Sequence, residues 1–332
     1  MTLLRIGVLG AARIAPNAIV NPARAVDGVE VLALAARDRA RAARFANKWG
    51  VPVVHSDYAA VLDDPMVDAV YIPLPNSLHA QWTLRAIAAG KHVLCEKPFT
   101  SNAAEARTVA EAADGSGLVV MEAFHYRYHP LMRRVLDLLA DGAIGPVRRV
   151  ETELSFPLPL FGDIRYRLDL AGGALMDAGC YAVHCLRQLG TGEPEVVSAE
   201  ARLRSPGVDR AMTASLRFPD GATGRVTCSM WSRRLLGVSA KVVGETGHLK
   251  IFNFVAPHVY HRLTVSSRGR SWHERVAGEP TYTCQLRAFA AAVRDSGEVL
   301  TPASDAVRTM KVIDDIYLTA GLQPRGQTTT GR

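Results

Sequence analysis

The chain has 332 residues, of which 48% are apolar and 21% charged, and its formal net charge is +7. This length suits two domains better than one, and the composition is ordinary for a globular protein. Lys and Arg are spread along the chain without the aromatic interleaving typical of base stacking, so we expect no nucleic-acid partner and ascribe the positive charge to binding of small anions.

Five cysteines are scattered without paired or zinc-ligand spacing: Cys95, Cys180, Cys185, Cys228 and Cys284. Such a set predicts reduced thiols and a cytoplasmic protein. The N-terminal run Leu3–Ala12 could imitate a short signal peptide, but Arg5 interrupts it and a helical segment follows, which favours a buried strand. No apolar run reaches the roughly 18 residues that a membrane span needs, so we expect no membrane segment.

Up to about residue 122, apolar strand-like runs alternate with segments of helical period. The expected strands are Leu4–Leu9, Val29–Ala35, Val51–His55, Ala69–Pro73, His92–Glu96 and Leu118–Glu122. The expected helices are Ile14–Arg24, Arg39–Trp49, Ala80–Ala89 and Ala103–Ala113. This alternation predicts an α/β domain at residues 1–123, with a doubly wound parallel sheet covered by helices on both faces.

The turn after the first strand is a degenerate match to the dinucleotide-binding pattern G-x-G-x-x-G. Gly10 keeps the tight-turn position, and Ala12 and Ala15 replace the other two glycines. Ala is still small enough to let the backbone approach a pyrophosphate. The candidate residues of this Rossmann turn are Gly10, Ala11, Ala12, Arg13 and Ile14. A generic strand-to-helix turn is the alternative.

The second strand is followed by Ala36, Arg37 and Asp38, with Arg41 one helical turn later. An NAD enzyme usually places an acid at the strand end, whereas two guanidinium groups there suit the 2′-phosphate of NADP. We therefore expect NADP(H) to be preferred, with NAD(H) possible, and we interpret Asp38 as the N-cap of the next helix. Solvated helix charges are the alternative for the two arginines.

Two more loops follow strand ends and so belong to the same edge of the sheet. The first contains Pro73, Leu74, Asn76 and His79; Asn76 offers an amide to the cofactor, while His79 could contact the cofactor or simply begin a helix. The second is Glu96-Lys97-Pro98. A Lys beside apolar residues needs a partner or a ligand, and a nicotinamide site would provide one. A surface Lys-Pro turn is the alternative.

After an expected helix at His129–Asp141, alternating apolar and polar residues predict half-buried strands. These are 150–156, Val196–Leu203, Ala211–Phe218, Gly224–Met230, Gly237–Val243, His248–Ile251 and Leu263–Ser266. Further helices are expected at Asp177–Leu189, Tyr282–Arg294 and Ser304–Thr319. The pattern predicts an α+β domain at residues 124–322 with a large, mostly antiparallel open sheet, and a flexible tail at 323–332.

Asp177 and Tyr181 are four residues apart and therefore share one helix face after the Gly172-Gly173 turn. A phenol can exchange a proton with a carbonyl oxygen, and a Lys ammonium can stabilise an alkoxide. A half-buried core aromatic is the alternative for Tyr181. Other candidates for substrate contact are Arg127, Arg165 and Tyr166. Arg165 and Arg167 could meet a substrate phosphate or be solvated loop charges.

The spacing of His125, Arg127 and His129 could suggest a metal site. No carboxylate or thiolate lies at ligand spacing from them, so we expect no metal.

These motifs resemble the Gfo/Idh/MocA oxidoreductases over nearly the whole chain, from Ile6 to about Gly321. The specific anchors are 75–79, Glu96-Lys97-Pro98 and 172–181. The resemblance implies that Lys97 contacts the nicotinamide ribose and the reacting oxygen, with a Lys97–Pro98 bond that is often cis. Many members have His where this chain has Tyr181, and the Tyr resembles the subgroup with glucose-fructose oxidoreductase, dimeric dihydrodiol dehydrogenase and deoxysugar 3-ketoreductases.

The resemblance implies an NAD(P)-dependent enzyme that moves hydride between the nicotinamide and a hydroxyl or ketone carbon of a sugar, nucleotide sugar, cyclic polyol or dihydrodiol. Lys97, Tyr181 and Asp177 would form its catalytic set. A non-catalytic dinucleotide-binding sensor and a nicotinamide-dependent glycosidase are the alternatives. We expect a homodimer or homotetramer joined through the second-domain sheet, because its strands carry apolar residues beyond the needs of one face.

Overall fold

The computed structural model describes residues 3–160, 162–232 and 235–326, which form two compact units. The first unit contains the chain up to Thr100 and residues 104–128 and 281–307; the second contains residues 101–103, 129–280 and the chain from Arg308 onward. The ranges expected from the sequence stay predictions, and the observed division differs from them by returning residues 281–307 to the first unit.

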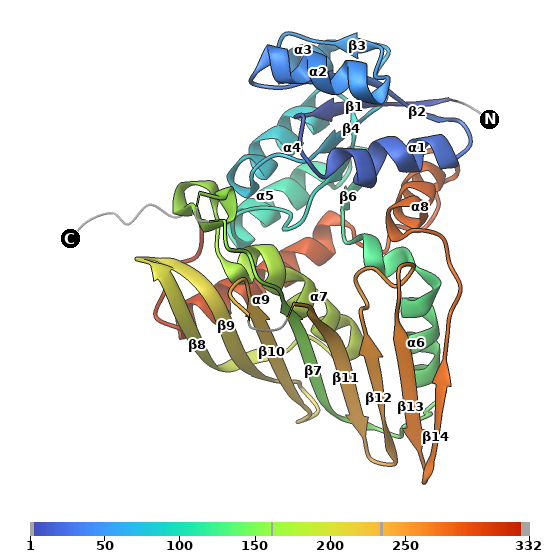
Figure 1. Ribbon diagram of the computed structural model, residues 1–332, viewed down its shortest axis with the longest axis vertical. Coiled ribbons are helices and arrows are strands. Elements are labelled where there is room, and N and C mark those ends of the chain that lie inside the picture. Colours follow the sequence, from blue (N-terminus) through green and yellow to red (C-terminus); the bar gives the residue numbers. More distant parts are fainter. Residues whose placement is uncertain (1–2, 161, 233–234, 327–332) are drawn as a thin grey trace. The chain divides into compact units, whose positions relative to one another are not determined.

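The first unit is built on a six-stranded parallel sheet of order β3-β2-β1-β4-β5-β6, as the alternating pattern predicted (Figure 1). Its strands are β1 (Leu4–Leu9), β2 (Val29–Ala35), β3 (Val53–Val54), β4 (Ala69–Ile72), β5 (His92–Cys95) and β6 (Val120–Glu122). Its helices are α1 (Asn21–Ala25), α2 (Arg39–Trp49), α3 (Tyr58–Asp63), α4 (His79–Ala88), α5 (Ala103–Ala113) and α8 (Thr281–Asp295). The strand order reverses between β1 and β4, and loops at such a point form a nucleotide-binding crevice.

The helix expected at Ile14–Arg24 begins later and is irregular. A wide turn at Pro16–Val20 precedes α1, and the Asn21 N–H donates to the carbonyl of Pro16, five residues earlier. Pro22 has no N–H to give to the carbonyl four residues before it, so the regular helical pattern cannot continue through this point.

Helix α8 completes the core of the first unit although it comes after the whole second sheet in the sequence. Its side chains Leu286, Phe289 and Ala290 are buried in one cluster with Ile6 and Val8 of β1. Arg294 adds a hydrogen bond to the carbonyl of Asp27.

The second unit is built on an eight-stranded sheet of order β14-β13-β12-β11-β7-β10-β9-β8. Its strands are β7 (Val147–Ser155), β8 (Glu195–Ser205), β9 (Val208–Arg217), β10 (Thr223–Ser229), β11 (Gly237–Gly244), β12 (Gly247–Phe252), β13 (Arg262–Ser267) and β14 (Arg270–Glu274). Neighbouring strands pair antiparallel except β7 and β10, which run parallel. The other helices are α6 (Pro130–Ala140), α7 (Cys180–Leu189) and α9 (Ala303–Thr319), the last of which begins in the first unit.

One face of this sheet is apolar and packs against α7, whereas the other is polar. On β7, Val150, Thr152 and Leu154 are buried and alternate with the partly exposed Glu151 and Glu153, as the period predicted. The polar face contains a hollow of about 500 Å³, lined by charged and hydroxyl side chains that include Glu153, Glu200, Arg202, Arg225 and Thr227. The described lining of this hollow is therefore mostly polar, and it does not show the surplus of apolar residues that we took as the reason for a subunit contact.

The tail that we expected to be flexible from residue 323 contains a buried side chain in its first part. Arg325 is only 2% exposed, and its guanidinium lies 2.7 Å from a carboxylate oxygen of the buried Asp209. Asn102 donates a hydrogen bond of 2.8 Å to the Arg325 carbonyl. The polar composition of this segment did not indicate that Arg325 forms a buried ion pair. Residues 327–332 lie outside the described residues.

Candidate active site

In the first unit, the loop from Gly10 to Ile14 leaves the carboxyl end of β1. The Gly10 N–H donates to the Ala35 carbonyl at the end of β2, over 2.8 Å. Gly10 has a φ of +122°, and a Cβ there would lie 3.2 Å from the Leu74 side chain. Glycine is therefore required, both for the backbone angle and for the close approach of the 73–76 loop. Arg13 and Ile14 are exposed at the tip of this loop.

Arg37 and Arg41 lie beside this loop. Asp38 caps α2, since its carboxylate accepts the Arg41 N–H over 3.0 Å, which confirms the predicted cap and lowers the pKa of Asp38. The Arg41 guanidinium donates to the Ala11 carbonyl over 2.7 Å, and Arg37 is exposed. Both cations thus follow the end of β2, and Arg41 contacts the turn after β1.

His79 links two loops of the crevice and is not placed to contact a ligand. The ring is fully buried, with Nδ1 2.8 Å from the Pro98 carbonyl and Nε2 2.8 Å from the Leu74 carbonyl. Burial lowers the pKa of His79 against the raising effect of both carbonyls, and Lys97 lowers it further. We therefore correct its expected role: His79 holds the 73–76 loop against the 96–98 loop. Pro73 and Leu74 are buried there, and Asn76 is half-buried.

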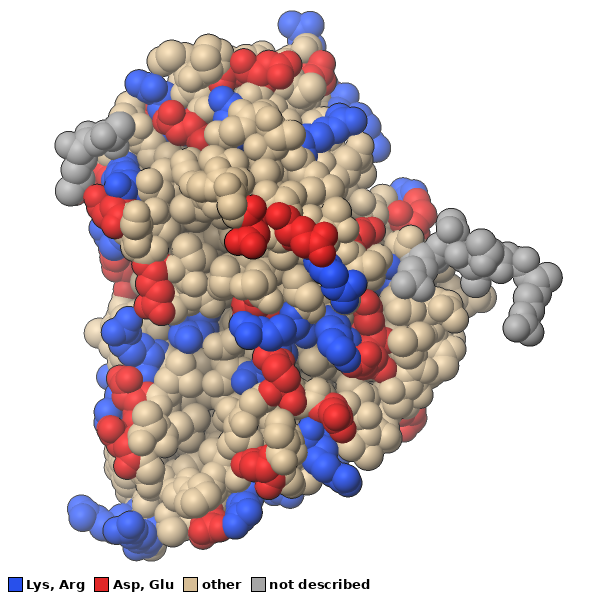
Figure 2. All heavy atoms as spheres, turned by 180° about the vertical axis from the view of Figure 1, so that it is seen from behind, with Lys and Arg blue, Asp and Glu red and all other residues tan. Residues whose placement is uncertain are grey.

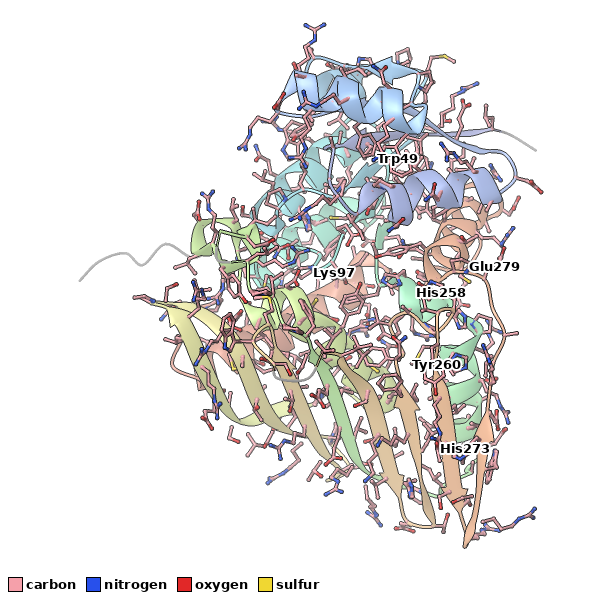
Figure 3. All side chains as sticks on the ribbon, viewed as in Figure 1. Trp49, Lys97, His258, Tyr260, His273 and Glu279 are labelled. Carbon is pink, nitrogen blue, oxygen red and sulfur yellow. The ribbon has the colours of Figure 1, made fainter. Side chains whose placement is uncertain are left out.

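Lys97 lies two residues after the end of β5, at the carboxyl edge of the sheet (Figure 3). Its peptide bond to Pro98 is cis, as the resemblance implied. The neighbouring Glu96 is buried and accepts hydrogen bonds from the Tyr71 hydroxyl at 2.7 Å and from the Lys97 N–H at 3.3 Å. Glu96 therefore holds the loop in place, and the half-buried Lys97 lies at the carboxyl edge of the sheet.

Arg127 belongs to a short turn, His125–Tyr128, that follows β6 at the same edge. The turn is held by α8: His125 Nδ1 lies 2.8 Å from the Thr281 hydroxyl, and the centres of the His125 and Tyr282 rings are 4.0 Å apart. Burial and the charge of Glu96 raise the pKa of Tyr282, so this phenol stays protonated. The sequence did not single out Tyr282, because nothing local connects it to this edge.

In the second unit, Asp177 and Tyr181 lie at the start of the helical segment that packs on the apolar sheet face. A wide turn, Leu175–Gly179, leads into α7, and the Asp177 N–H donates to the Gly173 carbonyl over 3.0 Å. Tyr181 is 6% exposed. Asp177 and Tyr181 thus belong to one continuous helical segment, whose first turn is wider than that of an ordinary α-helix.

Asp177 forms an ion pair with Arg165, with 3.0 Å between its Oδ1 and the Arg165 Nε. Asp163 holds the same guanidinium from the other side, also at 3.0 Å. The two carboxylates raise the pKa of Arg165, Asp177 more than Asp163. Asp177 and Arg165, expected in separate roles, are thus brought together.

The Tyr166 hydroxyl makes hydrogen bonds within the protein. The side chain is buried, and its hydroxyl lies 3.1 Å from the carbonyls of both Leu158 and Met230. We therefore correct its expected role as a substrate contact: Tyr166 joins the chain ahead of the Gly172-Gly173 turn to the end of β10.

The described residues contain no group of three His, Cys, Asp or Glu side chains arranged as metal ligands. Among those residues there is also no helix with the length and apolar character needed to cross a bilayer. On the face shown in Figure 2, acidic and basic side chains are intermixed.

Two family models match the chain. Residues 4–124 match the oxidoreductase family with an NAD-binding Rossmann fold, and residues 132–250 match the GFO/IDH/MocA C-terminal domain. A D-xylose 1-dehydrogenase (NADP(+)) of Haloferax volcanii is 39% identical over 95% of this chain and 96% of its own. A trans-1,2-dihydrobenzene-1,2-diol dehydrogenase of Mus musculus is 38% identical over 69% of this chain and 68% of its own.

Among solved structures, a 3-ketoreductase from Actinomadura kijaniata in complex with NADP and TDP-benzene superposes with a TM-score of 0.89. It is 33% identical in sequence, over 97% of this chain and 98% of its own. The chain is therefore a member of the Gfo/Idh/MocA oxidoreductase family, and both the predicted family and the predicted fold class are confirmed.

Proposed function

We propose that this oxidoreductase is an NADP-dependent dehydrogenase or ketoreductase that acts on a carbohydrate-like ring, with Lys97, Tyr181 and Asp177 as its catalytic set. The observation that supports this proposal most is the position of these residues within each of the two units. Lys97 lies at the carboxyl edge of the parallel sheet, and Tyr181 lies one turn after Asp177 at the start of α7. The names of the xylose dehydrogenase and the 3-ketoreductase support this substrate class and cofactor.

The first turn and the end of β2 fit a phosphorylated dinucleotide. Gly10 has the left-handed backbone that this turn needs and makes room beside Leu74, and a ligand phosphate would find N–H groups of the turn. Arg37 and Arg41 would hold a 2′-phosphate, since a guanidinium fork matches phosphate oxygens. We therefore propose NADP(H) as the preferred cofactor, with NAD(H) bound less tightly.

Bound nicotinamide would supply or accept the hydride. In the reducing direction, Lys97 would stabilise the negative charge that develops on the carbonyl oxygen, and the Tyr181 hydroxyl would give that oxygen a proton. In the oxidising direction, Tyr181 would take the proton from the substrate hydroxyl. Asp177 would orient Arg165 and the first turn of α7.

The charges near Asp177 favour an uncharged ring over a nucleotide sugar. Arg165 is already neutralised by Asp163 and Asp177, and Arg167 pairs with the exposed Asp169. A substrate phosphate would have to displace a carboxylate to use either cation. We therefore expect free aldoses or polyols to be turned over with a higher kcat/KM than their nucleotide-linked counterparts.

We also propose that the chain forms a homodimer or homotetramer joined through the polar face of the eight-stranded sheet. We further propose that it works in a reducing cytoplasmic compartment. The cytoplasmic compartment is supported by the scattered spacing of the five cysteines, four of which are buried. Light scattering would show the mass of two or four chains. Placing Arg at Thr227, inside the hollow of that face, should shift the mass to that of one chain; a mass that does not change would refute the proposed contact face.

The test of the activity is NADPH oxidation with keto-sugars and NADP reduction with the corresponding sugars. Lys97→Ala and Tyr181→Phe should each lower kcat by several orders of magnitude while NADPH still binds, and Tyr181→Phe should also change the basic limb of the pH-rate profile. Lys250→Ala and Tyr260→Phe, at exposed positions of the second unit, are the matched controls and should keep full activity.

Two outcomes would refute this proposal. Cofactor binding without turnover of any sugar would identify a sensor. Release of free sugar from a glycoside, with no net change in nicotinamide absorbance, would identify a glycosidase.

A further inference from the structure

The Gly172-Gly173 turn is packed so tightly that a side chain at either glycine would overlap neighbouring atoms. A Cβ at Gly172 would lie 2.6 Å from the Arg165 carbonyl oxygen, and one at Gly173 would lie 2.1 Å from Asp209 Oδ1. Gly173 also has a φ of +137°, which other residues rarely adopt. The turn therefore lies directly against the buried Asp209 and against the loop that contains Arg165.

Asp209 acts as a distant cap for the segment that contains Asp177 and Tyr181. It lies on β9, is fully buried, and its Oδ2 accepts the Leu175 N–H over 2.7 Å. The first N–H groups of a helical segment have no partner within the segment, and a carboxylate at that end is also favoured by the helix dipole. The position of Asp209 therefore fixes where this segment begins.

Arg325 holds Asp209 and the turn at the same time. One guanidinium nitrogen, Nη2, donates to Asp209 Oδ1 and another, Nε, donates to the Gly172 carbonyl, both over 2.7 Å. The Tyr317 hydroxyl donates to the same Oδ1 over 2.9 Å. The centre of the Tyr317 ring lies 4.0 Å from the guanidinium carbon of Arg325. Burial alone raises the pKa of Asp209, and the charge of Arg325 opposes that shift.

We propose that Arg325, through Asp209 and the Gly172-Gly173 turn, is a positioning residue for Asp177 and Tyr181. The connection is continuous: Arg325 binds the Gly172 carbonyl, Asp209 binds the Leu175 N–H, and the Gly173 carbonyl accepts the Asp177 N–H. A Lys at 325 would keep the charge but could not reach both acceptors with the fixed spacing of the guanidinium fork. This inference rests on the proposed function, because it assigns Arg325 a role through the proposed catalytic residues.

The test compares Arg325→Lys with two controls in the full-length chain. Arg325→Lys should lower kcat roughly ten- to a hundredfold, the effect of a small misplacement of catalytic groups, and leave the Kd of NADPH unchanged. Tyr317→Phe removes a different hydrogen bond to Asp209 and should lower the unfolding midpoint without lowering kcat. Arg148→Lys, at an exposed ion pair of the same unit, should change neither.

Tyr181→Phe separates this inference from the function on which it rests. In that background Arg325→Lys should cause no further loss of kcat, because the residue through which it acts is gone. An equal loss in both backgrounds, an unchanged kcat in the single variant, or an equal loss in Tyr317→Phe would overturn the inference alone. If Tyr181→Phe itself keeps wild-type turnover, the proposed function fails and this inference fails with it.

Hydrogen exchange of the unaltered chain gives a readout that does not depend on whether a variant folds. The amides of Leu175 and Asp177 should exchange as slowly as those of the central strands β7 and β10. Fast exchange at Leu175 would show that Asp209 does not hold this turn, and would also overturn the inference.

Discussion

Acidification should destabilise the second unit through His129. This side chain is 1% exposed, caps α6, and accepts the Leu131 N–H at Nδ1 over 3.1 Å. Burial, helped by the charges of His261 and His258, lowers the pKa of His129 from 6.5 to about 4. Protonation would place a cation in this buried site and remove the lone pair that accepts the cap hydrogen bond.

The sign of the effect follows from the lowered pKa. Between pH 6.5 and about 4 the unfolded chain binds a proton at His129 that the folded chain does not, so the free energy of unfolding falls as the pH falls. The whole shift corresponds to about 3 kcal/mol, and about 2 kcal/mol of this is lost by pH 5. At pH 7.5 the contribution is fully present.

The measurement is urea unfolding at pH 7.5 and pH 5, followed by tryptophan fluorescence, for the wild type and His129→Asn. Asn can still cap a helix but does not titrate. The wild type should therefore lose about 2 kcal/mol more than the variant between the two pH values, which cancels the contributions of the other histidines. If both chains lose the same free energy, the reasoning about His129 is refuted.

Two further predictions concern the first turn and the glycine turn. Arg37→Ala combined with Arg41→Ala should weaken NADPH binding by roughly 1.5–3 kcal/mol per charged hydrogen bond lost, and NADH binding much less; equal weakening in a fluorescence titration would contradict the 2′-phosphate assignment. Gly173→Ala should destabilise the chain by more than about 3 kcal/mol in denaturant unfolding, because the methyl group would overlap Asp209. Gly90→Ala, whose φ is +70° and whose Cβ would meet nothing within 4 Å, should cost only about 1–2 kcal/mol; similar losses for both would argue against a steric origin.

Most of the first unit could be predicted because its signals are local. The strands Leu4–Leu9 and Val29–Ala35 are apolar runs bounded by turn residues, and their observed bounds are those expected. Helix Arg39–Trp49 has a capping Asp38 at one end and Gly50, with a φ of +75°, at the other. Cap, period and stop agree there, so no distant contact is needed to define the element.

Other elements were missed where local signals are weak. Helix α3, at Tyr58–Asp63, is a single short segment whose main signal is the Asp57 cap. Strand β14, at Arg270–Glu274, is an edge strand with exposed residues on both faces, so it has no apolar alternation to reveal it. Edge strands of this polar kind discourage pairing with other chains.

In the candidate site, the residue types could be predicted but their partners could not. Asp177 and Tyr181 follow from spacing, yet the ion pair of Asp177 with Arg165 depends on how the loop at 163–167 folds back. Likewise, Arg325 is 116 residues from Asp209, and nothing near either residue indicates the other. Burial of charged groups is decided by such distant pairs, which a local pattern does not contain.

Because the chain returns to the first unit only at α8, the core of this unit cannot be completed until α8 has been synthesised. Leu286, Phe289 and Ala290 are translated only after the entire eight-stranded sheet, yet they fill the core next to β1. A nascent chain therefore exposes that apolar surface until synthesis passes α8, and a fragment ending at Tyr128 would keep it exposed permanently. Such a fragment should aggregate or require a chaperone, since exposed apolar surface on incomplete domains promotes association.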